Sequence, residues 1–400
     1  MSDTEIETAL SAFIVMSAQY LLLRKNKKPR QRRWWMTTHH KTRNQYDGTL
    51  LLSNLIQEPS GQFDNFCRMS SIDFEYLLQL IGPKIKKQDT IFRDSIPSKV
   101  RLAVTLRFLA TGDSFKSLHY LFKISPQVIS LIVPEVCKAL CEALHSFVKM
   151  PQNEHEWLEI ARGFEIRWQF PRCLGAIDGK HIKIQSPINS GSEFYNYKHN
   201  FSIILLAVAD SDYNFLFADV CVFLTHGRMS DGGVFNDSML YNKIYGPDSH
   251  FPQDAPLPGR HLPVPYVFVA DGAFALSKRI MKPFPGTPPV GSQNRKFNSR
   301  LSRARVVIEC AFGIMTSVFG VLKTNMLLQP EKASIITLTC VVLHNFLKKS
   351  QHSYRMYMPE GNIDNVLEEQ QLRSLDQIPI RTTENAREIR NEYASYFYSH

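Results

Sequence analysis

The spacing of apolar residues changes once along the chain, and the two parts predict different elements. From about residue 64 to residue 164, apolar positions recur at helical spacing. Gly112 separates two of the expected segments, and Ser125-Pro126 is a favourable helix start because serine can cap free N–H groups and proline already has a helical φ. We therefore expect helices at Ser71–Ile81, Ser98–Ala110, Ser114–Phe122 and Pro126–Phe147.

The last three of these helices follow one another through short turns, which fits a helix-turn-helix unit. A DNA-reading helix would present groups that suit phosphates or base edges. The last helix instead exposes a poor set for such contacts, namely Gln127, Ser130, Glu135 and Lys138. A purely structural helical subdomain is therefore about as well supported as a DNA reader.

From about Arg167 the pattern becomes that of strands rich in Val, Ile, Phe and Leu. Expected strands are Cys173–Ile184, Phe201–Ala209, Asn214–Phe223 and Tyr266–Ala270. Helical spacing returns at Ser299–Val318 and Glu331–Lys349, and the polar tail ends in a helix-like segment, Glu384–Phe397. This order predicts an α/β fold with a mixed sheet flanked by helices.

The N-terminal region adds a short apolar stretch and a basic run. Ala9–Leu23 follows three acidic residues and is shorter than the about 20 residues that a membrane span needs, so we interpret it as an amphipathic helix. Arg24–Arg33 carries seven basic residues and no acidic one. It predicts nuclear import or phosphate contact, with a solvated charge run equally well supported. Trp34 and Trp35 would anchor this arm.

These patterns together predict four regions in the 400-residue chain. Residues 1–50 form an N-terminal helix and basic arm, and residues 51–165 form the helical, helix-turn-helix-like region. Residues 166–350 form the α/β domain, and residues 351–400 form a tail that is partly disordered.

Overall charge and cysteine usage narrow the class of partner. The chain has 47 Lys and Arg against 37 Asp and Glu, a formal charge of +10, which favours nucleic acid first and an anionic membrane second. Its seven cysteines are scattered without Cys-x-x-Cys spacing, which is typical of reduced thiols in a cytosolic or nuclear protein.

Three carboxylates stand in unusual settings. Asp178 lies within a strand-like segment beside Gly179, Asp271 ends the apolar run 266–270, and Glu309 interrupts a helix that is apolar on almost every face. An unpaired buried carboxylate costs several kcal/mol, so Glu309 needs a partner. Each acid also has a structural alternative: a turn for Asp178, a helix cap for Asp271, and a salt bridge to Arg303, Arg305 or another arginine for Glu309.

A strand, a neighbouring strand end and a helix can bring such acids to one sheet edge. Mg²⁺ prefers oxygen ligands, and two divalent ions about 3.5–4 Å apart stabilise the attacking and leaving oxygens of a phosphodiester. Asp178, Asp271 and Glu309 therefore suggest a metal-dependent nuclease or transposase site. Asp210 and Asp212 are interpreted as turn formers, and Asp231 as a loop-ordering residue rather than a ligand.

Cations mixed with aromatic residues follow the first Asp. Such a mixture suits a phosphate track with base stacking, although lysines pointing to water explain any single position equally well. The residues expected to contact DNA from this stretch are Lys180, His181, Tyr197 and Lys198.

These motifs resemble the PIF/Harbinger-type DDE transposases and the nuclease-like proteins domesticated from them. The resemblance spans about residues 33–349 and is carried by several ordered segments: Arg101–Gly112, Leu174–His181, Asn189–Lys198, Gly227–Phe235, Val269–Phe274, Leu301–Gly313 and Val342–Phe346. It implies an RNase H-like core after a helix-turn-helix region, with Asp178, Asp271 and Glu309 matching the acidic triad.

The resemblance also implies a cofactor, partners and a location. We expect two divalent metal ions, Mg²⁺ or Mn²⁺. The expected substrate is DNA, with Arg228 and Arg303 among its contacts. We also expect a nuclear setting, a Myb-like accessory protein and a homo-oligomer. The expected activity is phosphodiester hydrolysis and strand transfer. The intact triad favours this enzyme. The segment 221–226, which is bulkier and longer than the family's link at this point, leaves open the alternative of a catalytically inactive DNA-binding or adaptor protein.

Overall fold

The computed structural model describes residues 48–58, 61–91, 94–191, 194–196, 199–221, 235–236, 238–246, 250–358 and 384–399, with Met16, Ser17 and Gln19. Residues 1–45 and 46–400 are two separate units, and the second contains all the elements discussed below. Apart from those three isolated residues, which are helical, the predictions for Ala9–Leu23, Arg24–Arg33 and the Trp pair lie outside the described residues.

The first part of the second unit is helical, as its apolar spacing predicts. All four expected helices are confirmed to within a few residues, and the bounds of this group are α3 (Gly48–Gln57), α4 (Gln62–Cys67), α5 (Ser71–Ile85), α6 (Ser98–Thr111), α7 (Phe115–Phe122), α8 (Pro126–Leu144), the 3₁₀ turn η2 (His145–Phe147) and α9 (Glu154–Trp168). Helix α9 was not expected from the sequence. It buries only Trp157, Ala161 and Phe164, and most of its other residues are charged or polar, so its apolar spacing is weak.

Local signals fix several of these helix ends. Gly112 ends α6 in the left-handed region with φ 72°, and its N–H donates to the Phe108 carbonyl. Ser114 Oγ accepts the Ser117 N–H at the start of α7. Ser125 does precede α8, but its side chain makes no cap hydrogen bond, so Pro126 at the first helical position is the signal that acts there.

Helix α8 buries one face and exposes the other. It packs against α5, α6, α7 and, from the far end of the sequence, α13 (Pro330–Lys349). Its Glu135 forms ion pairs with Lys87 and with the buried Arg101 of α6. A carboxylate that neutralises a buried arginine has a structural role, and the helix-turn-helix function of this region stays a prediction.

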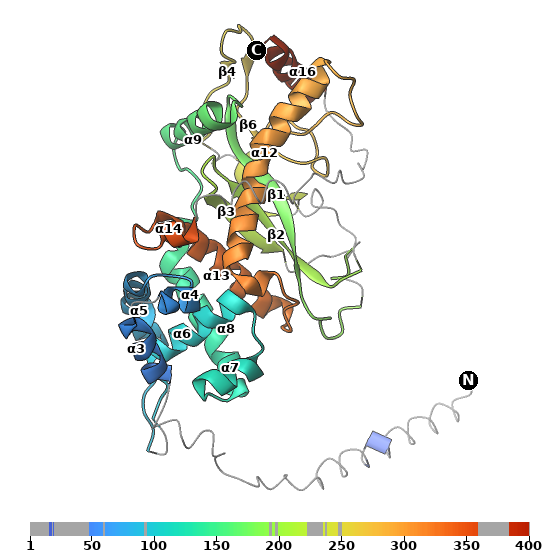
Figure 1. The fold of residues 1–400 in the computed structure, drawn as a ribbon. Coiled ribbons are helices and arrows are strands. Elements are labelled where there is room, and N and C mark those ends of the chain that lie inside the picture. Colours follow the sequence, from blue (N-terminus) through green and yellow to red (C-terminus); the bar gives the residue numbers. More distant parts are fainter. Residues whose placement is uncertain are drawn as a thin grey trace, which may run out of the picture. The chain divides into compact units, whose positions relative to one another are not determined.

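A mixed five-stranded sheet forms the second part of the unit (Figure 1). Strands β1 (Cys173–Lys183), β2 (Ser202–Ala209) and β3 (Phe215–Cys221) pair antiparallel, and β6 (Val267–Val269) and β7 (Ile280–Met281) continue the sheet parallel to β1. The strand order is β3-β2-β1-β6-β7. The predicted strands are confirmed, whereas β7 is too short to show a pattern in the sequence.

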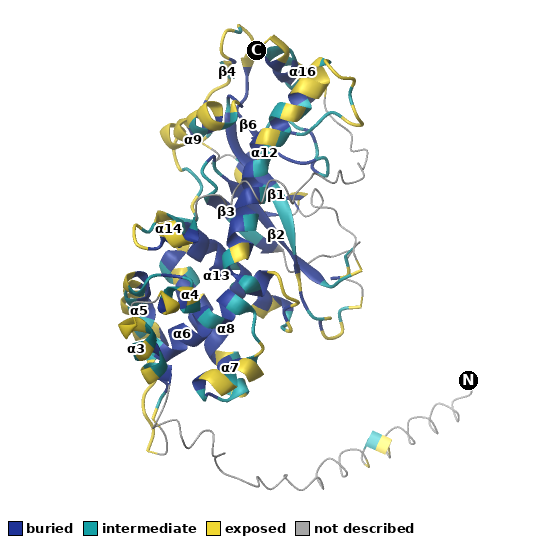
Figure 2. Cartoon of the chain, viewed as in Figure 1, coloured by how far each residue is buried: buried dark blue, intermediate teal, exposed yellow. Residues whose placement is uncertain are grey.

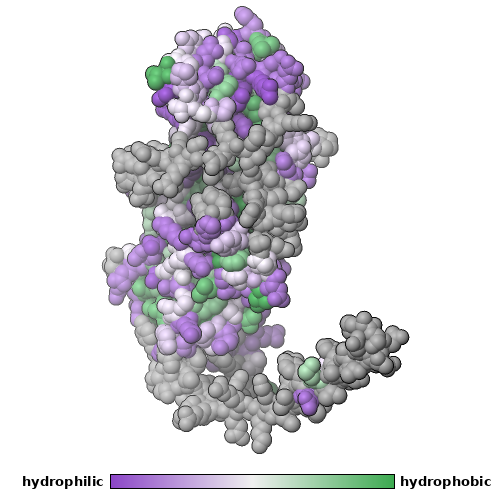
Figure 3. All heavy atoms as spheres, turned by 90° about the vertical axis from the view of Figure 1, so that its right-hand side faces the viewer, coloured by the Kyte–Doolittle hydropathy of each residue, from purple (hydrophilic) through white to green (hydrophobic). Residues whose placement is uncertain are grey.

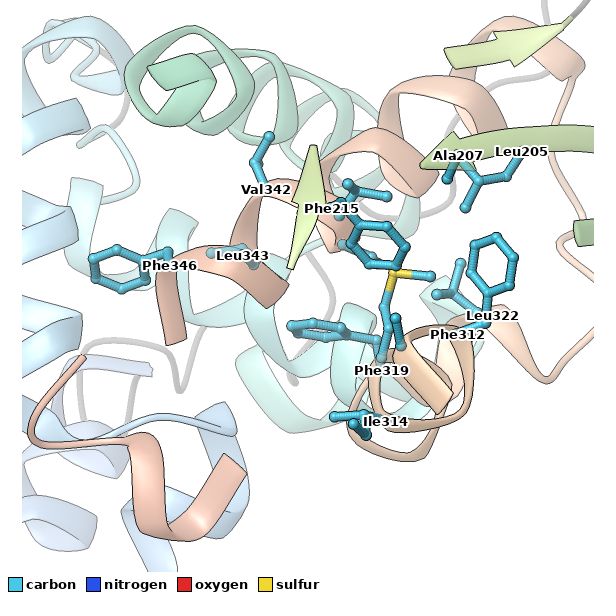
Figure 4. Close-up of a cluster of buried hydrophobic side chains, with 14 of the residues drawn as sticks. Leu205, Ala207, Phe215, Phe312, Ile314, Phe319, Leu322, Val342, Leu343 and Phe346 are labelled. Carbon is cyan, nitrogen blue, oxygen red and sulfur yellow. The ribbon is translucent and has the colours of Figure 1, made fainter. Parts of the chain in front are cut away.

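The sheet is buried on both faces (Figure 2). Leu205, Ala207 and Ala209 belong to one apolar cluster and Leu206 and Val208 to the other, as expected for alternation along a strand. Helices α12 (Gln293–Val318) and α13 cover the first face, and α9 and α11 (Met239–Tyr245) contribute to the second. Figure 4 shows the first cluster, in which Phe215 lies beside Phe312.

The long helix α12 begins earlier than its apolar pattern predicts. It starts at Gln293 rather than Ser299, because Ser292 Oγ accepts the Arg295 N–H and caps it. The first turns are polar except for Phe297, so they carry no helical period in the sequence. The minor elements of this part are the β4–β5 pair (Ala255–Pro256 with Pro263–Val264), the 3₁₀ turn η3 (Gly320–Leu322) and α14 (Tyr354–Tyr357).

The C-terminal helix α16 (Glu384–Ser399) confirms the helix-like end expected there and packs along α12 (Figure 1). Its Tyr393 and Phe397 rings contact Phe170, and Phe397 also contacts Phe297 of α12. On the outside, that end of the molecule is mostly hydrophilic (Figure 3). The end of the tail is therefore part of the folded core.

The motif Val342–Phe346 joins α13 to the β2–β3 hairpin. His344 is fully buried, with Nδ1 against the Tyr357 hydroxyl and Nε2 against the Tyr213 carbonyl. Asn345 accepts the Phe215 N–H and donates to the Phe147 and Phe215 carbonyls. The polar residues of this motif therefore hold elements together.

Candidate active site

Asp178 lies in the middle of β1, half-buried, and not in a turn. Its Oδ1 accepts the N–H of Gly179 at 2.9 Å, which fixes the carboxylate against its own backbone. Alternation along β1 places Asp178 on the same face as Ala176, which packs in the cluster covered by α12. The side chain therefore points to the α12 side of the sheet.

Asp271 stands two residues after the end of β6, the strand beside β1. Ala176 and Val269 are register partners in the parallel β1–β6 pair, and Asp178 and Asp271 each come two residues later. Asp271 is 8% exposed, and its Oδ1 accepts the N–H of Ala273 at 2.9 Å in a turn. No helix follows it among the described residues, so Asp271 is a turn residue and not a helix cap.

Glu309 comes from α12, the helix that lies over β1, β2 and β6. Its Oε1 accepts a hydrogen bond from Arg305 Nη2, one helical turn earlier, in an i,i+4 ion pair. The Glu309 and Arg305 side chains are only 15% and 14% exposed. The buried acid therefore has the arginine partner that the structural alternative requires.

Arg305 connects all three acids electrostatically. Burial on its own lowers the pKa of the Arg305 guanidinium. The negative charges of Glu309, Asp178 and Asp271, together with the hydrogen bond to Glu309, outweigh burial, and the net pKa is raised. The placement of the acids agrees with this effect, because Ala176 and Val269, two residues before Asp178 and Asp271, both pack in the cluster covered by α12.

The donor set suits a hard divalent ion, because all three candidate ligands are carboxylates. Among the residues that the structure describes, no three His, Cys, Asp or Glu side chains stand together closely enough to hold a metal ion as they are. One of the three carboxylates is engaged by Arg305 instead. The three carboxylates are thus ligands of the kind that Mg²⁺ or Mn²⁺ prefers. In this arrangement, however, Glu309 is bound to Arg305.

Two of the residues predicted to contact DNA point to opposite faces of β1. Lys180 lies on the Asp178 side, with Nζ 5.6 Å from the centre of the Phe312 ring of α12. His181 faces the other way, and its Nδ1 lies 2.9 Å from Ser202 Oγ. Adjacent strand residues cannot line the same groove, so Lys180 is the one positioned beside the acids.

Of the other predicted DNA contacts, Arg303 alone lies among the described residues. Arg303 is exposed on α12 and its Nη1 is 3.4 Å from Gln169 Oε1. Tyr197, Lys198 and Arg228, like Asp231, lie outside the described residues.

Lys282 is a cation beside Asp271 that the sequence did not indicate. It follows β7, and its Nζ donates to the Gly272 carbonyl at 3.3 Å, beside Asp271. Burial, and then the charge of Arg390, lower the pKa of Lys282, while Asp271 opposes them. Only the two-residue strand β7 places it there, and a strand that short leaves no signal in the apolar pattern.

Comparison with known proteins shows which proteins this site resembles. Residues 177–345, which include all three acids, match the DDE superfamily endonuclease family. The resemblance to the Harbinger-type DDE transposases is confirmed. DDE superfamily endonucleases use divalent metal ions.

Three relatives illustrate the similarity. The Arabidopsis thaliana protein named ALP1-like is 26% identical over 71% of this chain and 70% of its own length. The Homo sapiens protein named “Putative nuclease HARBI1” is 26% identical over 68% of this chain and 72% of its own. The Arabidopsis thaliana protein named Antagonist of Like Heterochromatin Protein 1 is 27% identical over 38% of this chain and 40% of its own. No solved structure matches the chain.

Proposed function

We propose that this protein is a metal-dependent DNA endonuclease derived from a transposase, with Asp178, Asp271 and Glu309 as its catalytic carboxylates. The observation that carries the proposal is that Asp178 and Asp271 stand at matched positions of the paired β1 and β6 segments, on the sheet face covered by α12, the helix that carries Glu309 and its buried partner Arg305. Three carboxylates gathered on one side of a sheet are costly unless they serve a cation. The match to an endonuclease family over these residues supports the same function.

The mixed sheet, with three antiparallel strands followed by two parallel ones and flanked by helices, is consistent with the RNase H-like core that we infer. Strands and a helix hold side chains more rigidly than loops do. The backbone hydrogen bonds to Asp178 and Asp271 orient their carboxylates, and the middle of α12 carries Glu309.

When bound, one or two divalent ions would activate water and stabilise the attacking and leaving oxygens of the phosphodiester. Asp178, Asp271 and Glu309 would hold them. Lys180, on the same face, would bind a phosphate of the DNA backbone, with Arg303, Tyr197, Lys198 and Arg228 as further proposed contacts. A 3′-OH freed by hydrolysis would serve as the nucleophile if strand transfer follows.

Several wider properties stay predictions. We propose a nuclear location, a Myb-like accessory protein and a homo-oligomer. We also propose that residues 51–165 act as a helix-turn-helix region. None of the described helices is long and apolar enough to cross a membrane.

The first test is plasmid nicking in Mg²⁺ and in Mn²⁺ by the full chain and by Asp178→Asn, Asp271→Asn and Glu309→Gln. Each change removes a negative oxygen ligand but keeps the size of the side chain, so we expect cleavage to be abolished while DNA retention persists. The matched control is Asp254→Asn, an exposed carboxylate 3.0 Å from Lys278, which should nick like the wild type.

Thermal unfolding of each variant separates loss of chemistry from loss of fold. Full activity in any of the three variants would remove that residue from the triad. Wild-type protein that binds DNA but stays inactive with both metals and a supplied accessory protein would favour the second candidate.

The second candidate is a catalytically inactive protein that keeps the fold as a DNA-binding or adaptor module. The ion pair between Arg305 and Glu309 favours it, because a purely structural pair would explain the buried acid without a metal. One relative is also named as an antagonist of a chromatin-type protein and not as a nuclease. The nicking test decides between the two functions.

A further inference from the structure

Arg305 forms an ion pair with one of the candidate acids, Glu309. It lies one helical turn before Glu309, and its side chain is as deeply buried as that of its partner. The guanidinium has five N–H donors in a fixed plane. One of the donor groups, Nη2, contacts Glu309, whereas Nε is buried without a hydrogen-bond partner among the described residues. The arginine is therefore held by charge more than by complete hydrogen bonding.

The charge balance around Arg305 is uneven. Glu309 forms an ion pair with the Arg305 guanidinium, and the charges of Asp178 and Asp271 also act on it, so this one cation responds to three acids. Lys282 lies at the Asp271 turn and Lys180 against Phe312, whereas Arg305 is the cation that pairs directly with Glu309. A group in this position screens the repulsion between the acids, which is also the electrostatic effect of a bound divalent ion.

We propose that Arg305 is a built-in counter-ion that competes with the divalent metal for Glu309. In this state the guanidinium neutralises part of the acidic site, and a metal ion binds only when Arg305 releases Glu309. The inference rests on the proposed function, because it takes the three acids as the metal ligands. It adds that the site exists in two forms, one closed by arginine and one open to metal.

The direction of the effect distinguishes this role from a positioning role. If Arg305 competes with the metal, removing its charge strengthens metal binding. If Arg305 only orients Glu309 as a ligand, removing it weakens binding. Without metal, loss of the guanidinium leaves three acids with less screening, so the apo protein should unfold at a lower temperature.

The experiment measures binding of Mn²⁺ alone to the full chain, by titration calorimetry and by electron paramagnetic resonance, with no DNA present. Arg305→Gln should bind Mn²⁺ at least about tenfold more tightly than the wild type, because unit charges in contact at a partly buried site interact by more than that factor. Arg305→Lys should fall between the two, since a cation remains but cannot form the planar contact. Arg300→Gln, on the same helix but hydrogen-bonded to Gln169, should bind like the wild type.

Thermal unfolding in chelator and in Mn²⁺ provides a second readout. Arg305→Gln should lose stability in chelator and regain it in saturating Mn²⁺, so its metal-induced rise in melting temperature should exceed that of the wild type. If Arg305→Gln fails to fold without metal, Arg305→Lys carries the binding test.

Equal or weaker Mn²⁺ binding by Arg305→Gln would overturn the inference and leave the proposed nuclease untouched. Binding that Asp178→Asn does not weaken, or no binding by any variant, would overturn both. Tighter binding by Arg305→Gln in a protein that never cleaves DNA would support the counter-ion while refuting the nuclease.

Discussion

His344 is fully buried and hydrogen-bonded through both ring nitrogens, and its environment sets a pH limit on the fold. Burial lowers its pKa from the usual 6.5 to about 3, with the hydrogen bond to the Tyr213 carbonyl opposing the shift. Because the folded pKa is the lower one, the unfolded chain binds a proton between these values that the folded chain does not.

We therefore expect the free energy of unfolding to fall as the pH drops below about 6.5, by at most about 1.4 kcal/mol per pH unit from this group. Above pH 6.5 His344 is neutral in both the folded and the unfolded chain, so this group no longer lowers the free energy of unfolding. Urea unfolding between pH 7.5 and pH 4.5 measures it. His344→Gln should be less stable at neutral pH but should show a flatter pH dependence.

The exposed His352 offers the control for this measurement. His352→Gln should keep the pH dependence of the wild type. If His344→Gln and the wild type lose stability with the same slope, the acid sensitivity belongs to other groups.

Single residues also show how far the sequence predicts the site. Asp178, Asp271 and Glu309 stand out because each is an acid in an apolar setting, and that signal is local. Four arginines, at 295, 300, 303 and 305, precede Glu309, and the sequence offers a salt bridge to Arg303, Arg305 or another arginine as an alternative. The ion pair with Arg305 agrees with that alternative, but the electrostatic link of Arg305 to Asp178 and Asp271 could not be predicted. Only the helix geometry and the register of β1 against β6 select one of them.

At the scale of elements, long segments with strong apolar spacing are predicted well. Helices α5, α6 and α8 and strands β1 and β2 differ from expectation by only a few residues at an end. The strand β7 and the polar first turns of α12 escape prediction, because each is defined by contacts with a distant partner or by a cap and not by its own pattern. These elements matter, since β7 carries Lys282 to the site.

The docking of α16 on α12 gives a prediction for a whole element. Tyr393 is fully buried, stacks on Phe170 with ring centres 5.5 Å apart, and reaches the Pro265 carbonyl. We expect Tyr393→Ala to lower the free energy of unfolding by about 3–4 kcal/mol, as is usual for large buried side chains replaced by alanine. Denaturant unfolding of the full chain measures it.

Tyr398 provides a matched control on the same helix, because it is 52% exposed. Tyr398→Ala should change stability by no more than about 0.5 kcal/mol, as is typical of surface positions. Equal losses for the two variants would mean that α16 does not pack as described. The ion pair between Arg260 and Glu392 should survive in both.

At the scale of the whole molecule, the formal charge of +10 predicts salt-sensitive DNA binding. We expect the logarithm of DNA affinity to fall linearly with the logarithm of salt concentration. Deleting residues 24–33 should flatten this dependence by about 0.9 in slope for each DNA phosphate that the segment neutralises. Fluorescence anisotropy at a series of salt concentrations measures it for the full chain and for the deletion.

The comparison variant keeps residues 24–33 but replaces their seven basic residues by Gln, so that length is unchanged. It should behave like the deletion if charge is the cause. An unchanged slope in both variants, together with loss of nuclear entry in cells, would assign this segment to import alone.

The contact between α16 and Phe170 also bears on how the protein is made. Phe170, just before β1, leaves the ribosome more than 200 residues ahead of the helix whose Tyr393 and Phe397 cover it. At about 5–20 residues per second, that interval is on the order of 10–40 s. During this time Phe170 lacks the rings of α16 that cover it in the folded protein. The yield of the protein in cells should therefore depend on chaperones that shield this ring until α16 is synthesised.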